Sequence, residues 1–321
     1  MTDVLDLLAD GAVHSGQELA GHLGVSRTAV WKQIGRWQER GLVIEVLPGR
    51  GYRWQAPLEW WNEAVLRQSL SEASNALLQV LHIARELPST NDTVADLRRT
   101  GLPSPQAVLA ESQTAGRGRR GRQWESPLGA CFCGSIGWTF TGGFSVLEGL
   151  SLAVGVAVVN ALRRYGMSGV GLKWPNDIMV GDAKLGGVLI ELQAEANGLC
   201  HVVIGIGLNL SLPPGLAERV GREVTDVQSC TGAPLARNRL GGMLLDEILQ
   251  LLADYEAKGF AGWQAQWGEL DVMRGQQVEV SGLEQPVIGI AAGVDARGAL
   301  LVESAGGLVA VAAGEVSLRR A

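Results

Sequence analysis

The feature that most restricts the fold is a run of glycines and arginines at residues 116–122, which stands between two strand patterns. The run contains the spacing G-x-G-x-x-G, but a dinucleotide-binding fingerprint with that spacing opens a helix inside a βαβ unit. Here residues 124–129, Trp-Glu-Ser-Pro-Leu-Gly, are typical of a loop that leads into a strand. The sequence therefore predicts a strand–loop–strand segment and excludes a Rossmann-type phosphate loop.

The residue types of this loop indicate what it binds. Its glycines allow the backbone to reorganise, and its arginines offer planar groups with several donors to a phosphate or carboxylate. We interpret it as a mobile cationic loop that closes over an anionic intermediate. A solvated basic loop and a second nucleic-acid patch are the alternatives.

The loop lies in a region of alternating strand and helix patterns, from about residue 78 to residue 266. Apolar alternation and short apolar runs predict strands at residues 80–85, 107–111, 131–138, 184–193 and 201–206. Helical patterns cover residues 89–99 and, as one long buried helix, residues 145–164. This region is therefore predicted to be a mixed α/β domain with helices packed against one sheet.

The first 54 residues predict a winged helix-turn-helix. Ser15 and Glu18 have the spacing of a capping box at the start of a second helix, and Ser26 caps a third, longer helix. Residues 42–54 then read as a β-hairpin around a Pro-Gly turn. We assign this unit to residues 1–60.

One face of the third predicted helix is suited to DNA. Val30, Ile34 and Trp37 form its apolar side. The opposite face and the tip of the hairpin hold the predicted DNA contacts, which are Arg27, Thr28, Trp31, Lys32 and Arg50. The chain has a net charge of −6, whereas residues 26–54 hold six basic and two acidic side chains, a charge of +4. This contrast favours DNA binding, with a protein-interaction module as the alternative.

The end of the chain predicts a separate small β domain. From Val272 onward, short strands alternate with turn residues, a pattern that favours an SH3-like barrel. The predicted strands are residues 277–281, 287–294, 300–303 and 308–312. The predicted domains are therefore residues 1–60, 61–270 and 271–321.

Residue usage also indicates the compartment. The most apolar stretch, residues 149–162, is shorter than the roughly 20 residues of a membrane helix, and the N-terminus has no signal-peptide pattern. We expect Cys131 and Cys133 to be buried strand thiols, with half of a metal site as the alternative. The expectation is a cytoplasmic protein that does not associate with membranes.

Three further segments carry candidate ligand-binding residues. Residues 173–177, Lys-Trp-Pro-Asn-Asp, place Asn176 and Asp177 at the end of a strand, where binding sites are common. Lys184 precedes a glycine pair that lets the backbone approach a ligand, and its charge suits a phosphoryl group. Asn209 follows small residues at the end of another strand, in reach of a nucleotide phosphate or its metal ion. Each signal is weak alone.

Taken together, these segments resemble those of the biotin–protein ligases, and most closely the bifunctional bacterial repressor-ligases. The resemblance rests on residues 89–91, 113–124, 173–177, 184–191 and 205–209, which follow one another in the family order. With the winged helix in front and the small β domain behind, it covers nearly the whole chain. It implies a central domain of the class II aminoacyl-tRNA synthetase/biotin synthetase type.

The resemblance implies a biotin site and a nucleotide site. Ser89, Thr90 and Gln113 match contacts to the ureido ring of biotin, and Trp124 matches an aromatic side chain over the activated intermediate. The complete implied biotin site is Ser89, Thr90, Asn91, Gln113, Gly116, Arg117 (through its backbone), Arg119, Trp124, Lys184 and Gly187. The implied ATP site is Arg119, Arg122, Asn176, Asp177, Asn209 and Arg319, with Mg²⁺ near Asn209 and Asp177.

Three of these residues are the implied catalytic residues. Arg119 matches the residue that retains the adenylate. Lys184 matches a lysine near the biotin carboxylate and the α-phosphate of ATP, and Asp177 is a candidate base for the incoming amine. Residues 212–222 are interpreted as a second mobile loop over the adenine.

The implied enzyme activates biotin with ATP as biotinyl-5′-AMP and transfers it to a lysine of the biotin carboxyl carrier protein. Biotinyl-AMP is also the implied corepressor, since the homodimer that forms with it would bind operator DNA and repress biotin synthesis genes. Two alternatives remain: a lipoate- or octanoate-type protein ligase, and a biotin-sensing repressor without ligase activity.

Overall fold

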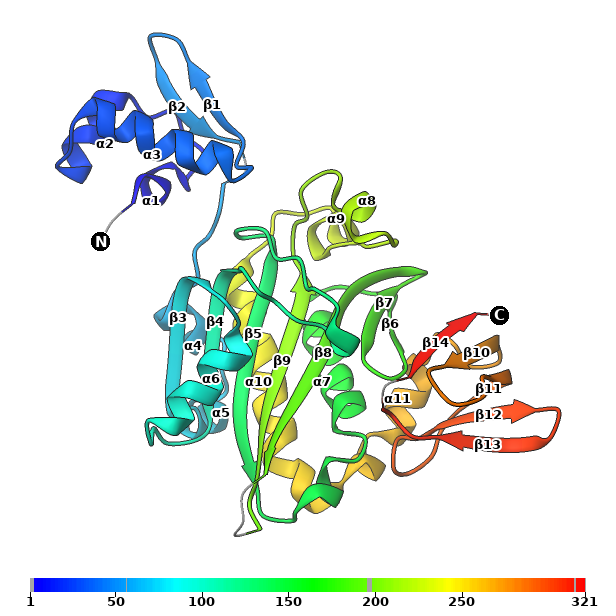
Figure 1. The fold of residues 1–321 in the computed structure, drawn as a ribbon. Helices are drawn as coiled ribbons and strands as arrows, with labels where there is room; N and C mark the ends of the chain where they lie inside the picture. Colours follow the sequence, from blue (N-terminus) through cyan, green and yellow to red (C-terminus); the bar gives the residue numbers. More distant parts are fainter. Residues whose placement is uncertain (1–2, 56, 195–197, 315, 321) are drawn as a thin grey trace. The chain divides into compact units, whose positions relative to one another are not determined.

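The computed structural model describes residues 3–55, 57–194, 198–314 and 316–320. The chain divides into two compact units, Met1–Trp60 and Trp61–Ala321 (Figure 1). In the part of the chain that the structure describes, no helix is long and apolar enough to cross a membrane.

The first unit is a helix-turn-helix followed by a hairpin, as predicted. Its elements are α1 (Val4–Leu8), α2 (Gly16–Leu23), α3 (Arg27–Glu39), β1 (Ile44–Leu47) and β2 (Gly51–Trp54). The Ser15 hydroxyl accepts a hydrogen bond from the Glu18 amide at 3.1 Å, and the Ser26 hydroxyl caps α3. β1 and β2 pair antiparallel. The local capping and turn chemistry of the sequence is therefore sufficient to account for these elements.

A backbone contact joins this hairpin to the helices. The amide of His14 donates to the carbonyl of Tyr52 at 3.0 Å, and the amide of Tyr52 donates to the carbonyl of His14 at 2.9 Å. Gly51 lies against this contact with a φ of 140°, and a Cβ there would stand 2.0 Å from the His14 carbonyl oxygen. Glycine at position 51 is therefore required for the hairpin to pack where it does.

The second unit is built on a mixed seven-stranded sheet. Its strands are β3 (Val80–Leu87), β4 (Gln106–Gln113), β5 (Cys131–Phe140), β6 (Val170–Lys173), β7 (Asp177–Val180), β8 (Ala183–Ala194) and β9 (Cys200–Asn209), in the spatial order β3-β4-β5-β9-β8-β7-β6. β3 and β4 run parallel, and the remaining neighbours pair antiparallel. The predicted mixed α/β class is confirmed.

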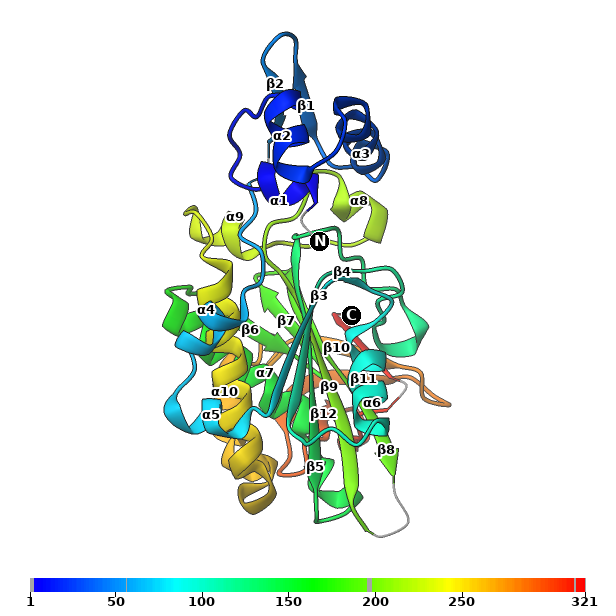
Figure 2. The ribbon, with the colours of Figure 1, turned by 90° about the vertical axis from the view of Figure 1, so that its left-hand side faces the viewer.

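Helices cover both faces of this sheet. The helices of this unit are α4 (Glu63–Gln68), α5 (Glu72–Leu77), α6 (Thr90–Arg99), α7 (Leu150–Tyr165), α8 (Leu216–Val220), α9 (Val227–Thr231), α10 (Arg237–Lys258) and α11 (Gln264–Leu270). α7 and α10 pack together on one face, whereas α6 covers the other face over β4, β5 and β9 (Figure 2). The long α10 contributes much of the core but was not among the elements predicted from the sequence.

The predicted helix at residues 145–164 begins later than expected. Phe144–Leu147 forms a separate 3₁₀ turn, and α7 starts only after Gly149, which has a φ of 71°. A Cβ at position 149 would lie 2.4 Å from Cγ of Phe260. The tertiary contact with Phe260 therefore sets this helix start, and the local apolar pattern does not reveal it.

The C-terminal segment forms a five-stranded antiparallel sheet. Its strands are β10 (Gln277–Ser281), β11 (Val287–Val294), β12 (Leu300–Ser304), β13 (Gly307–Val311) and β14 (Ser317–Arg320), in the order β13-β12-β11-β10-β14. Four of these were predicted, and β14 is an addition. The sheet belongs to the same compact unit as the seven-stranded sheet, and the Trp174 indole donates to the Gly298 carbonyl between them at 3.1 Å. The domain boundary at residue 270 and the closed barrel stay predictions.

Cys131 and Cys133 are buried in β5, as expected. Cys200 is buried in β9, whereas Cys230 is exposed in α9. Among the described residues there is no group of three side chains that could hold a metal ion through histidine, cysteine or carboxylate ligands.

Candidate active site

A cavity of about 860 Å³ in the second unit gathers the predicted ligand-binding residues. It lies among the N-terminus of α6, the glycine-arginine loop, the turn between β6 and β7, strands β8 and β9, and β14. Of the predicted biotin and ATP residues, those that line it are Ser89, Thr90, Asn91, Gln113, Arg117, Arg119, Arg122, Trp124, Asn176, Asp177, Lys184, Gly187, Asn209 and Arg319. Segments more than 200 residues apart in the sequence thus meet at one site.

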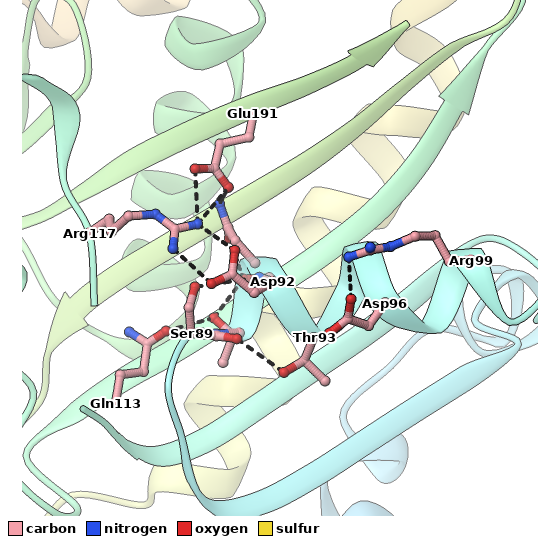
Figure 3. A network of polar contacts seen from close by, with 11 residues as sticks. Ser89, Asp92, Thr93, Asp96, Arg99, Gln113, Arg117 and Glu191 are labelled. Atoms are coloured by element: carbon pink, nitrogen blue, oxygen red, sulfur yellow. Dashed lines mark hydrogen bonds and ion pairs between the residues drawn. The ribbon is translucent and has the colours of Figure 1, made fainter. Parts of the chain in front are cut away.

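One end of the cavity is a network of neutral polar groups. The Thr90 amide and hydroxyl both donate to Oε1 of Gln113, at 2.8 and 3.1 Å. The buried Ser135 hydroxyl lies 2.6 Å from both the Thr90 hydroxyl and Oδ1 of Asn91. Ser89 caps α6, so the helix N-terminus points its first amides toward this end (Figure 3). Fixed donors and acceptors of this kind suit an uncharged, urea-like ligand.

The root of the glycine-arginine loop borders this polar end. The Arg117 guanidinium forms a bidentate pair with Asp92, at 2.8 and 2.6 Å, and also contacts Glu191 at 3.1 Å (Figure 3). The Arg117 guanidinium lowers the pKa of the Asp92 carboxyl. Asp92 and Glu191 were not predicted as site residues, because nothing in their local sequence indicates a partner so distant along the chain.

Glycines let Trp124 and Asn91 approach the sheet. A Cβ at Gly207 would stand 2.5 Å from Cε2 of Trp124, and a Cβ at Gly205 would stand 2.4 Å from Oδ1 of Asn91. β9 is a continuous strand through both glycines. These positions therefore provide space for the indole and the amide above the strand.

Gly116 does not line the cavity, unlike the other predicted biotin residues. Its carbonyl accepts a hydrogen bond from the Trp124 amide at 2.9 Å. A Cβ at this position would stand 2.7 Å from the carbonyl oxygen of Trp124. In this structure Gly116 supports the loop that carries Trp124.

Lys184 and Asp177 form an ion pair in the middle of the cavity. The Lys184 residue is 9% exposed, and burial lowers the pKa of its ammonium group, against the opposing effect of Asp177. Burial likewise lowers the pKa of Lys173, which also lines the cavity. Asp177 was predicted at the end of a strand, but it begins β7, where it pairs with Lys173 across the β6–β7 hairpin.

The two asparagines of the predicted ATP site have structural contacts. The Asn176 amide donates to the Val188 carbonyl at 2.8 Å. The Asn209 amide donates to the carbonyl of Thr225 at 2.9 Å, and the Cys131 thiol lies 3.8 Å from its Oδ1. Both side chains line the cavity while holding neighbouring backbone in place.

The other end of the cavity is strongly cationic. The Arg119 guanidinium donates to the Gly314 carbonyl and, at 3.4 Å, to Oδ1 of Asn176. Among the described lining residues there are nine basic side chains and two carboxylates. The basic set is Arg117, Arg119, Arg120, Arg122, Lys173, Lys184, Arg219, Arg222 and Arg319. Such an excess of cations suits a polyphosphate.

Several of these cations were not among the predicted site residues. Arg219 and Arg222 belong to the segment at residues 212–222 that was interpreted as a second loop, and α8 forms within it. Arg120 has a φ of 60° and lines a smaller cavity of about 380 Å³ together with Arg122 and Arg319. Arg120 belongs to the loop whose arginines were expected to bind an anion. A basic side chain in a loop is usually solvated, so the sequence gives no such reason to select Arg219 and Arg222.

The predicted DNA face of the first unit is present in the structure. Val30 and Ile34 are buried at 0% and 1% exposure, which leaves the opposite side of α3 in solvent. The exposed side chains include all five predicted DNA contacts, Arg27, Thr28, Trp31, Lys32 and Arg50. Trp31 is 62% exposed.

Comparisons with known proteins agree with this organisation. Family models match residues 1–53 as a helix-turn-helix domain, residues 83–209 as the biotin/lipoate A/B protein ligase family, and residues 275–319 as the biotin protein ligase C-terminal domain. The chain is 36% identical to the bifunctional ligase/repressor BirA of Escherichia coli, over 99% of this chain and 97% of that protein. It is 30% identical to the bifunctional ligase/repressor BirA of Bacillus subtilis, over 95% of this chain and 93% of that protein.

The second unit is also similar to a solved structure, the biotin protein ligase from Aquifex aeolicus in complex with biotin and ATP. The identity is 26%, the TM-score is 0.66, and the match covers 76% of this chain and 100% of that chain. Because the similarity to the bacterial relatives extends through the helix-turn-helix, the sheet that holds the cavity and the C-terminal strands, the chain belongs to the family of bifunctional biotin ligase/repressor proteins.

Proposed function

We propose that this protein is an ATP-dependent biotin–protein ligase that is also a transcriptional repressor. The observation that carries the ligase assignment is the two-ended cavity, in which a neutral polar network meets a cluster of cations across the Lys184–Asp177 pair. The neutral end suits the ureido ring of biotin, and the cationic end suits the triphosphate of ATP. The biotin carboxylate then meets the α-phosphate near Lys184.

The first step forms a mixed anhydride. A carboxylate oxygen of biotin attacks the α-phosphorus of ATP, the new oxygen–phosphorus bond forms, and the bond to the bridging oxygen of the β-phosphate breaks, releasing pyrophosphate. Two anions must approach each other, so buried cations lower the barrier. Lys184 screens the reacting atoms, while Arg122 and Arg319 bind the outer phosphates.

The second step transfers biotin to the carrier protein. The ε-amine of a carrier lysine attacks the acyl carbon of biotinyl-AMP, a carbon–nitrogen bond forms, AMP leaves, and the amine loses a proton. Asp177 is one of the two carboxylates that line the cavity, and it accepts that proton in our proposal. The glycine-arginine loop covers the intermediate with Trp124 and so excludes water, which would hydrolyse it.

Magnesium enters with ATP as part of the substrate. Mg²⁺ prefers one or two carboxylates together with phosphate oxygens and water. Asp177 fits this preference, since its carboxylate lines the cavity, and Asn209 would offer only its Oδ1, because its amide nitrogen donates to the Thr225 carbonyl. When bound, the ion supplies charge neutralisation at the phosphates.

An Arg119→Ala variant tests the ligase proposal. Purified protein is incubated with ATP, Mg²⁺, biotin and a biotin carboxyl carrier domain, and the mass of the carrier is followed. The wild type should add one biotin and leave lipoate and octanoate unused. The variant lacks the guanidinium that contacts Gly314 and Asn176 at the cationic end of the cavity. Biotinyl-AMP should therefore escape from it about 10- to 100-fold faster.

The matched control is Arg99→Ala, which removes an exposed arginine of α6 outside the cavity lining. It should behave like the wild type. If lipoate or octanoate is transferred in place of biotin, the chain is a lipoate- or octanoate-type protein ligase. If no acyl group is transferred while biotinyl-AMP binds tightly, the chain is a sensor without ligase activity.

For repression, we propose that the first unit binds operator DNA and that biotinyl-AMP promotes a homodimer. β8 pairs with β7 only as far as Gly187. The segment from Leu189 to Ala194 is therefore an open strand edge in the described part of the sheet. An open edge can accept a strand of a second copy, and Leu192 on it is 51% exposed. A two-fold dimer then presents two α3 helices to a two-fold operator.

An Arg50→Ala variant tests the DNA contact. Arg50 is exposed at the hairpin turn, so its removal should weaken binding to all duplexes and reduce the slope of log affinity against log salt by about 1. Binding is measured with a duplex that the wild type selects from a random pool in the presence of biotinyl-AMP. Arg53→Ala is the matched control, because Glu45 already compensates Arg53 at 2.6 Å. An unchanged slope for Arg50→Ala would contradict the wing contact.

A further inference from the structure

The side chain of Arg117 has partners unrelated to the backbone role that the resemblance implies for this residue. Its two terminal nitrogens donate to both oxygens of Asp92 at 2.8 and 2.6 Å. One of them also lies 3.1 and 3.3 Å from the two oxygens of Glu191 (Figure 3). One guanidinium is therefore held by two carboxylates that come from α6 and β8.

This cluster is more than a surface ion pair. Exposed single pairs contribute little, whereas bidentate arginine pairs within a network hold a defined geometry. The exposed fractions of the side chains are 39% for Arg117, 52% for Asp92 and 37% for Glu191. The same Glu191 accepts a hydrogen bond from the Asn91 amide at 2.8 Å. The cluster thus joins the loop to a side chain of the polar end of the cavity.

Backbone pairing connects the held residue Arg117 to Trp124. Arg117 forms a bridge with Gln123, and the Trp124 amide donates to the Gly116 carbonyl at 2.9 Å. The Gly118 amide donates to the Arg122 carbonyl at 2.7 Å, which closes the tip of the loop as a small turn. The loop therefore has a paired root, at residues 116–117 and 123–124, and a separate tip at residues 118–122.

We propose that Asp92 and Glu191 are positioning residues of the ligase reaction: by holding Arg117 they fix the root of the glycine-arginine loop, and with it Trp124 and the Asn91 amide. The inference rests on the proposed function for its kinetic consequence. The root stays in place while the tip, with Arg119 and Arg122, opens for ATP and closes again. Biotin is selected by a site that is organised before the tip closes.

The test is an Asp92→Asn variant of the full-length protein. Asparagine keeps the size of the side chain and removes its charge. The KM for biotin should rise about tenfold and biotinyl-AMP should escape several times faster, while kcat and the KM for ATP stay within about twofold. Asp92→Glu should recover most of the loss, because the carboxylate is restored. A merely structural defect would lower kcat as well and would not respond to the glutamate.

The structure offers a matched control one turn further along α6. Asp96 pairs with Arg99 in an exposed ion pair of the same chemical type, outside the cavity lining (Figure 3). Asp96→Asn should leave the KM for biotin and the escape of biotinyl-AMP unchanged. Asp92→Asn and Arg117→Gln should not be additive, since each breaks the same pair. Additive effects, or an equal effect of Asp92→Asn and Asp96→Asn, would overturn the inference.

A second readout does not depend on catalysis. The loop contains four arginines at residues 117–122, and only Arg117 lies in the paired root, so trypsin cleavage after Arg117 reports opening of the root, whereas cleavage after the other three reports opening of the tip. Asp92→Asn should accelerate cleavage after Arg117 several-fold in the absence of ligands, and Asp96→Asn should not. If the wild type transfers no biotin, the proposed function fails. The cleavage rates alone then show whether the pair of Arg117 with Asp92 fixes the root of the loop. Equal cleavage rates in all three proteins would refute it.

Discussion

Lys184→Met should lower the rate constant of biotinyl-AMP formation by about 10²- to 10³-fold. The Lys184 ammonium group is buried in the cavity and paired with Asp177, so its charge acts at short range and with little screening by solvent. Methionine has a similar length and no charge. The single-turnover release of pyrophosphate from enzyme saturated with biotin and ATP measures this step.

The control for this experiment is Lys258→Met, which removes an exposed lysine paired with Asp254 at the end of α10. It should retain the wild-type rate. A loss below about fivefold for Lys184→Met would mean that the arginines alone stabilise the transition state.

The burial of Lys184 also predicts how the rate of pyrophosphate release depends on pH. Burial lowers the pKa of Lys184, so its charge is present at low pH and is lost on the alkaline side at a pH below the usual lysine range. The rate of pyrophosphate release should therefore fall on that side. Lys184→Arg, which stays charged, should move the fall to higher pH at a reduced maximal rate.

Arg237→Met should be the most destabilising of the single substitutions considered, at about 3–5 kcal/mol. The Arg237 guanidinium pairs with Glu111 at 2.8 Å, and both side chains are 4% exposed. It also lies over the ring of Trp61, with 4.3 Å to the ring centroid. Removing it leaves an uncompensated carboxylate in the core. Native-state hydrogen exchange of the β4 amides reports the loss for the second unit.

A double variant separates charge from packing. Replacing Glu111 by leucine together with Arg237→Met removes both charges, so a good part of the lost stability should return, less the hydrogen bond that Glu111 accepts from the Trp61 amide at 2.7 Å. Arg297→Met, in an exposed pair with Glu148, should cause a much smaller change. Equal losses for Arg237→Met and Arg297→Met would mean that the buried charge does not matter.

The elements that the sequence predicted are those with short-range signals. The capping box at Ser15, the N-cap at Ser26, the hairpin turn at residues 48–51 and the alternation of β3 each involve neighbours within a few positions, so they could be recognised directly. The glycine-arginine loop was correctly placed between two strands for the same reason.

What the sequence did not predict depends on residues far apart in the chain. The start of α7 depends on Phe260, more than 100 residues away, and the Glu111–Arg237 pair joins β4 to α10. For the site, the resemblance supplied many of the lining residues but not Arg219 or Arg222, and it did not select Asp92, which pairs with Arg117. Their neighbours in the sequence are those of ordinary solvated side chains, and only the fold brings them to the site.

The contact between Arg119 and the Gly314 carbonyl limits how the C-terminal sheet can be exchanged. A second contact joins β14 to the β7–β8 turn: Arg320 forms an ion pair with Asp182 at 2.7 Å. A chimera that grafts the last fifty residues from a homologue must therefore supply a compatible turn at 314 and a basic residue at 320 that can pair with the retained Asp182. In evolutionary terms, the sheet is therefore not freely exchangeable, and substitutions in its loops should affect Arg119, the residue that we propose retains the intermediate.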